Sequence, residues 1–143
     1  VLEDIASGKK VFAVNTHLDH VGKEARVKGT TLILEKASEY GKDLPIILTG
    51  DFNSRPDSEV VKFITDEKVA NSLIDTREHA VNKLDKGWTF HDFGELPVER
   101  RSYIDYIFVS KDIKVLEYRV SDEKLNDVYL SDHMPVVARI EIK

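Results

Sequence analysis

The 143-residue sequence contains no cysteine. Disulfide bonds and thiolate metal sites are therefore excluded, while the cellular compartment stays open. Long hydrophobic runs are also missing, because none approaches the roughly 20 residues that a membrane-spanning helix needs. An excess of positive charge is missing as well, since 26 acidic and 21 basic residues give a formal net charge of −5. We therefore expect no strong non-specific affinity for the backbone of DNA or RNA, which usually requires a basic surface.

The composition of the sequence is typical of a globular domain. Hydrophobic residues make up 41% of the chain and charged residues 33%, as is typical of globular proteins, and the length suits one domain with a substantial core. The negative charge does not exclude a nuclease, because a bound divalent cation and a few arginines can recruit phosphate. The chain begins with valine, so we expect a processed product or a fragment, and the sequence does not decide between a cytoplasmic and a secreted protein.

Apolar runs and their spacing predict an α/β domain. A strand is expected at 11–15 after a short extended piece and a turn, and a helix at 23–40. The run 46–49 is typical of a strand covered on both faces, and a second helix is expected to begin after Asp57 or Ser58. A polar connection at 66–87 is followed by extended segments at 88–90, 102–109, 115–120 and 136–142. This order predicts a mixed, mostly antiparallel sheet with helices on one face and the other face bare.

Four short polar clusters lie at the ends of these apolar runs, where layered α/β proteins often carry functional groups. They are Asn15–His20, Gly50–Asn53, Asp105 within 103–109, and Ser131–His133. Asp51 and Asn53 are two residues apart, so one side chain can accept a hydrogen bond from water while the other donates to a phosphate oxygen. A strand-to-turn junction uses Gly, Asp and Asn for backbone reasons alone, but the preceding buried strand favours a functional interpretation.

Asp105 is an acidic residue inside an otherwise aromatic and aliphatic run. A buried carboxylate is costly unless it is paired, and the imidazole of His133 is a suitable partner. An Asp–His pair fixes the imidazole tautomer and stabilises its protonated form. Such a pair could activate water or stabilise developing charge on a phosphate. Taken alone, Asp132 and His133 are more simply explained by a carboxylate that caps a turn and a histidine on the surface.

Several other side chains have both a functional and a structural interpretation. His17 and His20 have a spacing that a metal pair can use, but no third nitrogen ligand is evident, so we favour His17 as a donor to phosphate and His20 as a solvated residue. Arg100 and Arg101 can neutralise substrate phosphate, although exposed arginines are common. Trp88 can stack on a base or a sugar, and core packing is its alternative role.

The clusters, taken together and in order, resemble the motifs of the endonuclease/exonuclease/phosphatase family. That family includes DNase I-like nucleases, abasic-site endonucleases, inositol polyphosphate 5-phosphatases, deadenylases and neutral sphingomyelinases. The matching motifs are Asn15-Thr16-His17-Leu18, Gly50-Asp51-Phe52-Asn53, Tyr103-Ile104-Asp105-Tyr106-Ile107 and Ser131-Asp132-His133. Each motif is short, but four of them in this order make a specific signal over residues 10–142.

The resemblance implies Mg²⁺-dependent hydrolysis of a phosphodiester or phosphomonoester by in-line attack of water, with Mn²⁺ as an alternative ion. Asp51 would orient or deprotonate the water, and Asn53 would position it or bind the phosphate. His133, oriented by Asp105, would act as a base or stabilise the transition state. The sequence does not decide which group is the base.

The resemblance also implies roles around the metal and the leaving group. His17 would donate to the scissile phosphate or to the leaving group, while Asp132 and Asp51 would contribute to the metal environment. Arg100, Arg101 and Trp88 are the candidate substrate contacts. The principal Mg²⁺ ligand of the family is a Glu in its first half, and no residue of this chain can be matched to it.

The chain departs from the family pattern in its length. Family members resemble a four-layer α/β/β/α sandwich of about twice this size, and the resemblance begins in the second half. Residues 1–143 are therefore expected to be the C-terminal part of a single domain, whose bare sheet face would meet the missing half or self-associate. We expect the isolated chain to bind Mg²⁺ weakly and to have little activity.

Two other functions stay open at this point. One is a phosphomonoesterase that acts on inositol or lipid head-group phosphates. The other is a non-catalytic phosphate-binding or interaction module, for which the unmatched Glu argues and against which the retained motif residues argue. Nucleic acid is a candidate substrate, and no membrane span is expected.

Overall fold

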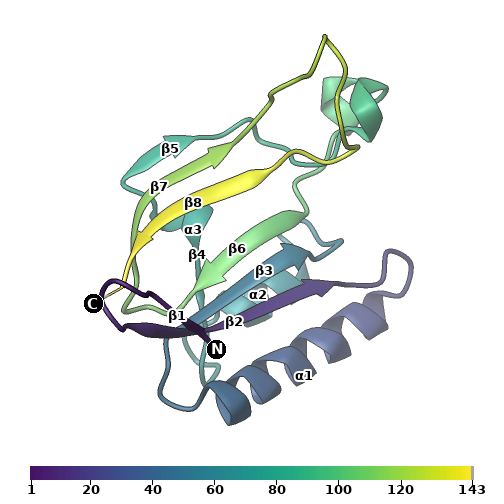
Figure 1. Ribbon diagram of the computed structural model, residues 1–143. Coiled ribbons are helices and arrows are strands. Elements are labelled where there is room, and N and C mark those ends of the chain that lie inside the picture. The colour runs from purple at the N-terminus through teal and green to yellow at the C-terminus, as the bar shows by residue number, and fades with distance from the viewer. Residues whose placement is uncertain (143) are drawn as a thin grey trace.

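A computed structural model describes residues 1–142 (Figure 1). Its strands are β1 (Leu2–Glu3), β2 (Lys10–His17), β3 (Ile46–Asp51), β4 (Ile74–Asp75), β5 (Asn82–Leu84), β6 (Asp105–Val109), β7 (Lys114–Val120) and β8 (Val136–Glu141). Its helices are α1 (Lys23–Gly41), α2 (Glu59–Thr65) and α3 (Thr76–His79), with 3₁₀ turns η1 (Asp92–Gly94) and η2 (Val98–Arg100). The order of the long elements is the one that the sequence predicts.

Across residues 1–142 the strands form two sheets, whereas the sequence suggested one. The five-stranded sheet has the order β1-β2-β3-β6-β4, and the three-stranded sheet has the order β5-β7-β8. β2 pairs with β3 in parallel and β5 with β7 in parallel, while the remaining pairs are antiparallel. β8 lies alongside β6, so the two sheets are neighbours (Figure 1). The fold is mixed α/β with mostly antiparallel pairing, as expected.

The main core lies between the five-stranded sheet and the two longer helices, which both cover the same face (Figure 1). It contains Leu34 and Ala37 of α1, Val61 and Ile64 of α2, Leu48 of β3, and Tyr106 and Phe108 of β6. Burying one such large side chain contributes roughly 1.5–3 kcal/mol. Ser58 begins α2, because its hydroxyl accepts a hydrogen bond from the Val61 N–H at 3.3 Å. The cluster therefore fixes β3 and β6 against the helices.

The opposite face of the five-stranded sheet is less covered. β2 alternates along its length, so Ala13, Asn15 and His17 are exposed on the side away from α1. A smaller apolar cluster covers the part of this face nearest β7 and β8. Its buried members are Val109, Ile113 and Val115, with Ile47, Ile74, Ala80, Ile107 and Ile140 packed around them. Beside β2 the face is open, as the sequence suggested.

The segment 66–87, expected to be a polar connection, contains β4, α3 and β5. Asp75 caps α3, since its carboxylate accepts a hydrogen bond from the Arg77 N–H at 2.9 Å. Burial raises the pKa of Asp75 to about 6. The Arg77 guanidinium lies 4.4 Å from the ring centre of Tyr103, whose hydroxyl is 2.6 Å from that of Tyr118. A buried polar network orders this segment, and local sequence propensity gives little sign of it.

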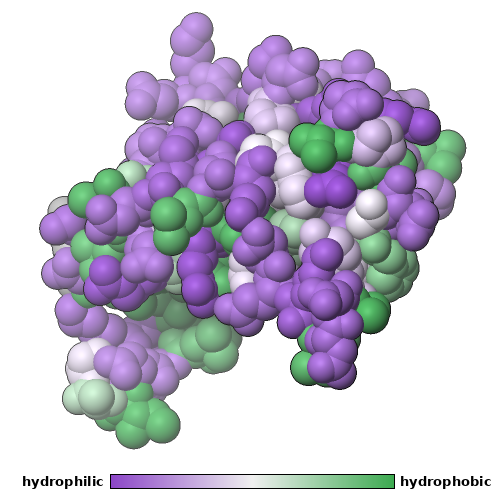
Figure 2. Space-filling view, turned by 90° about the horizontal axis from the view of Figure 1, so that it is seen from above, coloured by the Kyte–Doolittle hydropathy of each residue, from purple (hydrophilic) through white to green (hydrophobic). Residues whose placement is uncertain are grey.

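Within residues 1–142 no helix is long and apolar enough to cross a bilayer. Seen from above, the surface is mainly hydrophilic, with hydrophobic groups scattered between (Figure 2). Several exposed hydrophobic side chains belong to the loops between β5 and β6 and between β7 and β8: Phe93, Val98, Leu125, Val128 and Leu130.

Candidate active site

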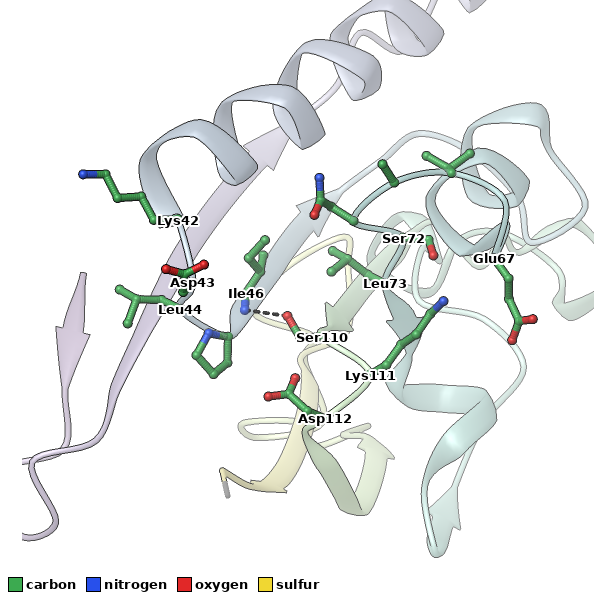
Figure 3. Close-up of a pocket in the computed structure, with 14 residues that line it drawn as sticks. Lys42, Asp43, Leu44, Ile46, Glu67, Ser72, Leu73, Ser110, Lys111 and Asp112 are labelled. Carbon is green, nitrogen blue, oxygen red and sulfur yellow. Dashed lines mark hydrogen bonds between the residues drawn. The ribbon is translucent and has the colours of Figure 1, made fainter.

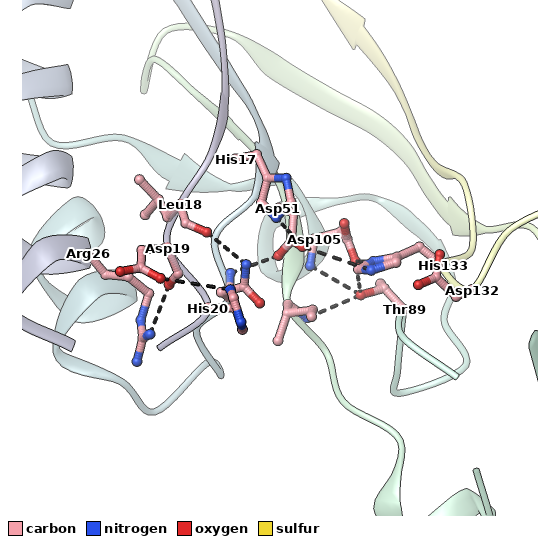
Figure 4. A network of polar contacts seen from close by, with 12 residues as sticks. His17, Leu18, Asp19, His20, Arg26, Asp51, Thr89, Asp105, Asp132 and His133 are labelled. Atoms are coloured by element: carbon pink, nitrogen blue, oxygen red, sulfur yellow. Dashed lines mark hydrogen bonds and ion pairs between the residues drawn. The ribbon is translucent and has the colours of Figure 1, made fainter. Parts of the chain in front are cut away.

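Strand register places three of the expected site residues side by side. His17 lies opposite Asp51 in the β2–β3 pair, and Asp51 lies opposite Asp105 in the β3–β6 pair. Because directly opposite residues share one face of a sheet, all three side chains are on the face away from α1. Nε2 of His17 is 3.4 Å from Oδ2 of Asp51. Figure 4 shows these side chains in a row at the strand ends.

Gly50 permits this close pairing. Its φ of +144° lies in a region that side chains rarely adopt, and a Cβ at this position would overlap the carbonyl oxygen of Thr16 on β2. Glycine is therefore required for β3 to approach β2 where the site residues begin.

His133 joins the cluster from the segment that precedes β8. Its Nδ1 donates a hydrogen bond to Oδ2 of Asp105 at 2.9 Å, and its Nε2 lies 3.9 Å from Oδ2 of Asp51. Phe90 supports the segment through an isolated bridge to His133, with ring centres 5.0 Å apart. One ring nitrogen is thus fixed by a carboxylate and the other faces the second carboxylate, an arrangement suited to proton transfer or charge stabilisation.

Thr89 is a site residue that the sequence analysis missed. Its side chain is fully buried, and its hydroxyl donates to Oδ2 of Asp105 at 2.5 Å. The hydroxyl oxygen of Thr89 in turn accepts hydrogen bonds from the backbone N–H groups of Ile104 and Asp105, each at 3.1 Å. Asp105 is therefore held by Thr89 on one side and His133 on the other. A threonine between two aromatic residues carries no distinctive sequence signal, so only the fold reveals this contact.

The local environment shifts the pKa values of two members of the cluster in the same direction. Burial raises the pKa of Asp51, and the nearby charge of Asp105 adds to the shift. Burial alone would lower the pKa of His133, but the hydrogen bond to Asp105 and the surrounding carboxylates outweigh it and raise the pKa. Asp51 thus holds a proton more readily than a solvated carboxyl, and perturbed pairs of this kind are common at functional sites.

Asn53 ties two strand ends together. Its backbone N–H donates to Oδ1 of Asp51 at 2.8 Å, and its Nδ2 donates to the carbonyl of Leu18 at 2.8 Å. Its φ of +46° lies in the left-handed region, which asparagine tolerates better than most residues. Donation to a phosphate oxygen, the role expected from the sequence, would require Nδ2 to leave Leu18. Oδ1 of Asn53 is the atom that remains available to orient water.

A group of three side chains fits a divalent cation. Asp51, Asp105 and His133 each offer a ligand atom, and these atoms all lie within 4.8 Å of one another. Two carboxylates and an imidazole suit Mn²⁺, and the carboxylates suit Mg²⁺. The carboxylate of Asp132 is not part of this group. Its backbone carbonyl instead accepts the N–H of the fully buried His91 at 2.9 Å, which anchors the segment that carries His133.

Of the three side chains expected to contact substrate, Arg101 and Trp88 contact each other and Arg100 is exposed. The Arg101 guanidinium lies 4.2 Å from the ring centre of Trp88, and its Nε donates to the carbonyl of Leu96 at 2.9 Å. This cation–π contact braces the loop before β6. Arg100 is exposed in η2. The side chain of His20 is 81% exposed, in agreement with its interpretation as a solvated residue.

Two cavities differ in their chemistry. The one at the cluster has a volume of about 360 Å³ and is lined by His17, Asp51 and Asp105 among others. A larger cavity of about 570 Å³ lies at the other end of the sheet, between the turn after α1, the segment 67–73 and the loop 110–112 (Figure 3). Its lining residues have charges of both signs and include no histidine. The smaller cavity is therefore the candidate active site.

The fold and the site together define an α/β protein with an acid–imidazole cluster at the ends of paired strands. Residues 5–133 match the Endonuclease/Exonuclease/phosphatase family. The chain belongs to this family, which confirms the resemblance drawn from the four motifs.

Related proteins include both phosphatases and nucleases. A family member from Bacteroides vulgatus has 37% identity and a TM-score of 0.89, covering 99% of this chain and 53% of that one. A mannosyl-6-phosphatase from Bacteroides thetaiotaomicron has 32% identity and a TM-score of 0.86, covering 98% and 54%. The CCR4-Not complex 3'-5'-exoribonuclease subunit Ccr4 of Phaeosphaeria nodorum is 36% identical over 87 residues, covering 59% of this chain and 14% of the relative. The chain spans about half the length of the solved structures it matches.

Proposed function

We propose that the chain provides part of the active site of a Mg²⁺-dependent phosphodiesterase, with nucleic acid as one candidate substrate. The observation that carries this proposal is the cluster of Asp51, Asp105 and His133, whose ligand atoms lie within 4.8 Å of one another. The Thr89 hydroxyl supports the cluster by a hydrogen bond to Asp105. The cluster combines a carboxylate whose pKa is raised by burial with an imidazole that is oriented by a second carboxylate. These groups suit hydrolysis by an activated water molecule.

Each residue has a role that its contacts allow. Asp51 accepts a hydrogen bond from the attacking water and draws off its proton, with Oδ1 of Asn53 fixing the direction of attack. His133, held by Asp105, places its Nε2 toward the reacting phosphate and stabilises charge there or takes the proton. His17, whose side chain is 74% exposed, donates to a phosphate or leaving-group oxygen.

A divalent cation fits beside the carboxylates. When bound, Mg²⁺ or Mn²⁺ neutralises charge on the phosphoryl and leaving oxygens. Asp51, Asp105 and His133 would hold the cation, since their ligand atoms lie within 4.8 Å of one another, whereas the Asp132 carboxylate lies outside this group. We propose that the principal carboxylate ligand, a Glu, is supplied from outside residues 1–143.

The open sheet face leads to a proposal about the rest of the domain. The chain covers 53% of its B. vulgatus relative, and β2 leaves Ala13, Asn15 and His17 exposed opposite the helices. We propose that residues 1–143 are the C-terminal part of one domain and that the remainder forms a further sheet over this face. Self-association through the same face is the alternative for the isolated chain.

A phosphomonoesterase is the second candidate. The mannosyl-6-phosphatase from B. thetaiotaomicron, which covers 98% of this chain, favours a sugar phosphate over an inositol or lipid phosphate. A non-catalytic phosphate-binding module is disfavoured, because such a module would not need the dyad of Asp105 and His133 or the supporting hydroxyl of Thr89.

The proposal is tested by measuring phosphoester hydrolysis by the longest natural protein that contains this chain. The substrates are a dinucleoside phosphate, mannose 6-phosphate and an inositol phosphate, each assayed with Mg²⁺, with Mn²⁺ and with chelator. Asp51→Asn is expected to lower kcat for the true substrate about a hundredfold or more, because general-base assistance is lost. Asp112→Asn, at an exposed position beside the larger cavity at the other end of the sheet, is the matched control. Unchanged turnover in Asp51→Asn, or turnover that survives chelation, would contradict the proposal.

A further inference from the structure

A third cavity borders the candidate active site at Asn53. It has a volume of about 390 Å³ and lies between the start of α1 and the segment that links β3 to α2. Its lining residues are Lys23, Arg26, Val27, Asn53, Ser54, Arg55, Asp57, Ser58, Glu59 and Val60. Asn53 also contacts Asp51 through its backbone N–H. One residue therefore separates this cavity from the carboxylate proposed to activate water.

Three cationic side chains from two segments line the cavity. Lys23 comes from the first turn of α1, Arg26 from its second turn, and Arg55 from the segment after β3. Lys23 is 3.8 Å from Glu59 across the rim. Within residues 1–142 no carboxylate oxygen lies within 4.0 Å of either guanidinium, and Arg55 makes only a 3.3 Å hydrogen bond to the Ser102 hydroxyl. Two arginines without acidic partners therefore face one concave surface.

Two residues that line this cavity, Arg26 and Ser54, also have buried polar atoms without hydrogen-bond partners. Among residues 1–142, the buried side-chain atoms that lack a hydrogen bond are Nε of Arg26, Oγ of Ser54 and the ring nitrogens of His91. Ser54 is 4% exposed. Nη1 of Arg26 donates to the Asp19 carbonyl at 2.9 Å, so this guanidinium is already held in place. A buried polar group left unpaired destabilises a protein, and two residues of this kind line the cavity.

We propose that this cavity is an anion subsite that binds a second phosphate group of the substrate, beside the phosphate that is cleaved. The inference rests on the proposed hydrolysis for the position of the scissile phosphate. A phosphate suits the site because its oxygens only accept hydrogen bonds, and arginine and lysine only donate them. Asp57 and Glu59 also line the cavity and offset part of its positive charge.

The second phosphate can come from two sources with the same chemistry. One is the next phosphodiester or a terminal phosphate of an oligonucleotide. The other is the additional phosphate of a sugar bisphosphate. Matched substrate pairs separate them: dithymidine monophosphate with its 5′-phosphorylated form, and mannose 6-phosphate with mannose 1,6-bisphosphate. The pair in which the added phosphate lowers KM identifies the source.

The test uses the longest natural protein that contains this chain. In the double variant Lys23→Gln/Arg55→Gln, the ratio of KM for the substrate with the added phosphate to KM without it is expected to rise about tenfold. This change corresponds to the loss of charged hydrogen bonds at a partly exposed site. Arg55→Lys is expected to restore part of the preference, and added salt should weaken it. Lys28→Gln, on an outward-facing turn of α1 where it pairs with Glu24, is the matched control.

Calorimetry on the Asp51→Asn protein separates failure of this inference from failure of the proposed reaction. Tighter binding of the phosphorylated member of a pair, lost in the double variant, supports the subsite even if no hydrolysis is found. Equal affinities within both pairs would overturn the subsite while leaving the reaction intact. An equal rise in KM for both members of a pair in the double variant would overturn it too.

Discussion

Replacing Thr89 with valine removes one hydroxyl group from the base of the site and keeps the shape of the side chain. In the native protein this buried hydroxyl donates to Oδ2 of Asp105 at 2.5 Å and accepts two backbone N–H groups at 3.1 Å. The valine methyl group can neither donate nor accept. The Asp105 carboxylate therefore keeps His133 as its remaining side-chain partner and gains freedom to rotate.

The expected magnitudes follow from these contacts. A hydrogen bond to a charged group contributes roughly 1.5–3 kcal/mol, and an unpaired buried N–H group costs about 1–3 kcal/mol. The two N–H groups share one acceptor, so Thr89→Val is expected to lower the free energy of unfolding by about 3–5 kcal/mol. A typical domain has about 5–15 kcal/mol, so a domain near the middle of this range remains folded after the change. Looser orientation of His133 is expected to lower kcat about tenfold with a smaller change in KM.

Urea denaturation and steady-state hydrolysis measure the two effects separately. Thr89→Ser retains the hydroxyl and should recover most of kcat, although it loses a buried methyl group. This comparison separates the hydrogen bond from general packing. Thr89→Val with native kcat, or a Thr89→Ser protein as slow as Thr89→Val, would show that Thr89 does not position the dyad.

Two further substitutions test the fold around the site. Gly50→Ala should prevent β2 and β3 from pairing at their ends, because the added Cβ overlaps the Thr16 carbonyl. The expected result is a loss of soluble yield and of the circular dichroism signal, and a fully stable variant would contradict it. Asp75→Asn should raise the free energy of unfolding at about pH 7 by up to about 3 kcal/mol, because burial raises the pKa of this carboxyl from 3.8 to about 6. A raised carboxyl pKa makes the native protein lose stability as pH rises from about 4 to about 6, so the gain should vanish at about pH 4 in urea denaturation, and a gain that is the same at both pH values would contradict the reasoning.

The sequence was a good guide to elements whose hydrophobic pattern is long. The helix expected at 23–40 is α1 (Lys23–Gly41), and the strand after Pro45 is β3 (Ile46–Asp51). α1 buries Thr30, Leu34, Ala37 and Gly41 at spacings of three and four, and β3 buries Ile46 and Leu48. These helical and strand periods are visible in the spacing of the residues alone. Gly41, expected to stop the helix, is its last residue, and the left-handed position falls on Lys42 with a φ of +47°.

Short elements and their partners were harder to predict. β4, α3 and β5 depend on the buried network around Asp75 and Arg77 rather than on a hydrophobic period. The segment expected to be extended at 88–90 forms isolated bridges at Phe90. The division into two sheets depends on strand pairing across the whole chain, which local patterns do not encode.

In the candidate site, too, the motif residues could be predicted from the sequence and a supporting contact could not. Motif residues placed His17, Asp51, Asp105 and His133 in one group, and the structure brings them together. Their supporting contact, Thr89, depends on a segment 16 positions away along the chain from Asp105. Side-chain contacts of this kind depend on the tertiary fold, so no spacing rule predicts them.

The pairing of His17 with Asp51 and of Asp51 with Asp105 has a consequence for how the protein can change over time. These positions are fixed by backbone hydrogen bonds of neighbouring strands, so the chemical groups keep their spacing as long as the sheet exists. The loops around them, at 92–100 and 121–131, contribute no partner to that pairing and can accept insertions and substitutions. Changes in these loops can therefore alter the surroundings of the candidate site while the spacing of its groups stays the same. A slip of one residue in the register of β3, in contrast, would turn Asp51 toward the helices and the apolar side chains of β3 away from them. The geometry of the candidate site and the core packing would therefore be lost in the same step.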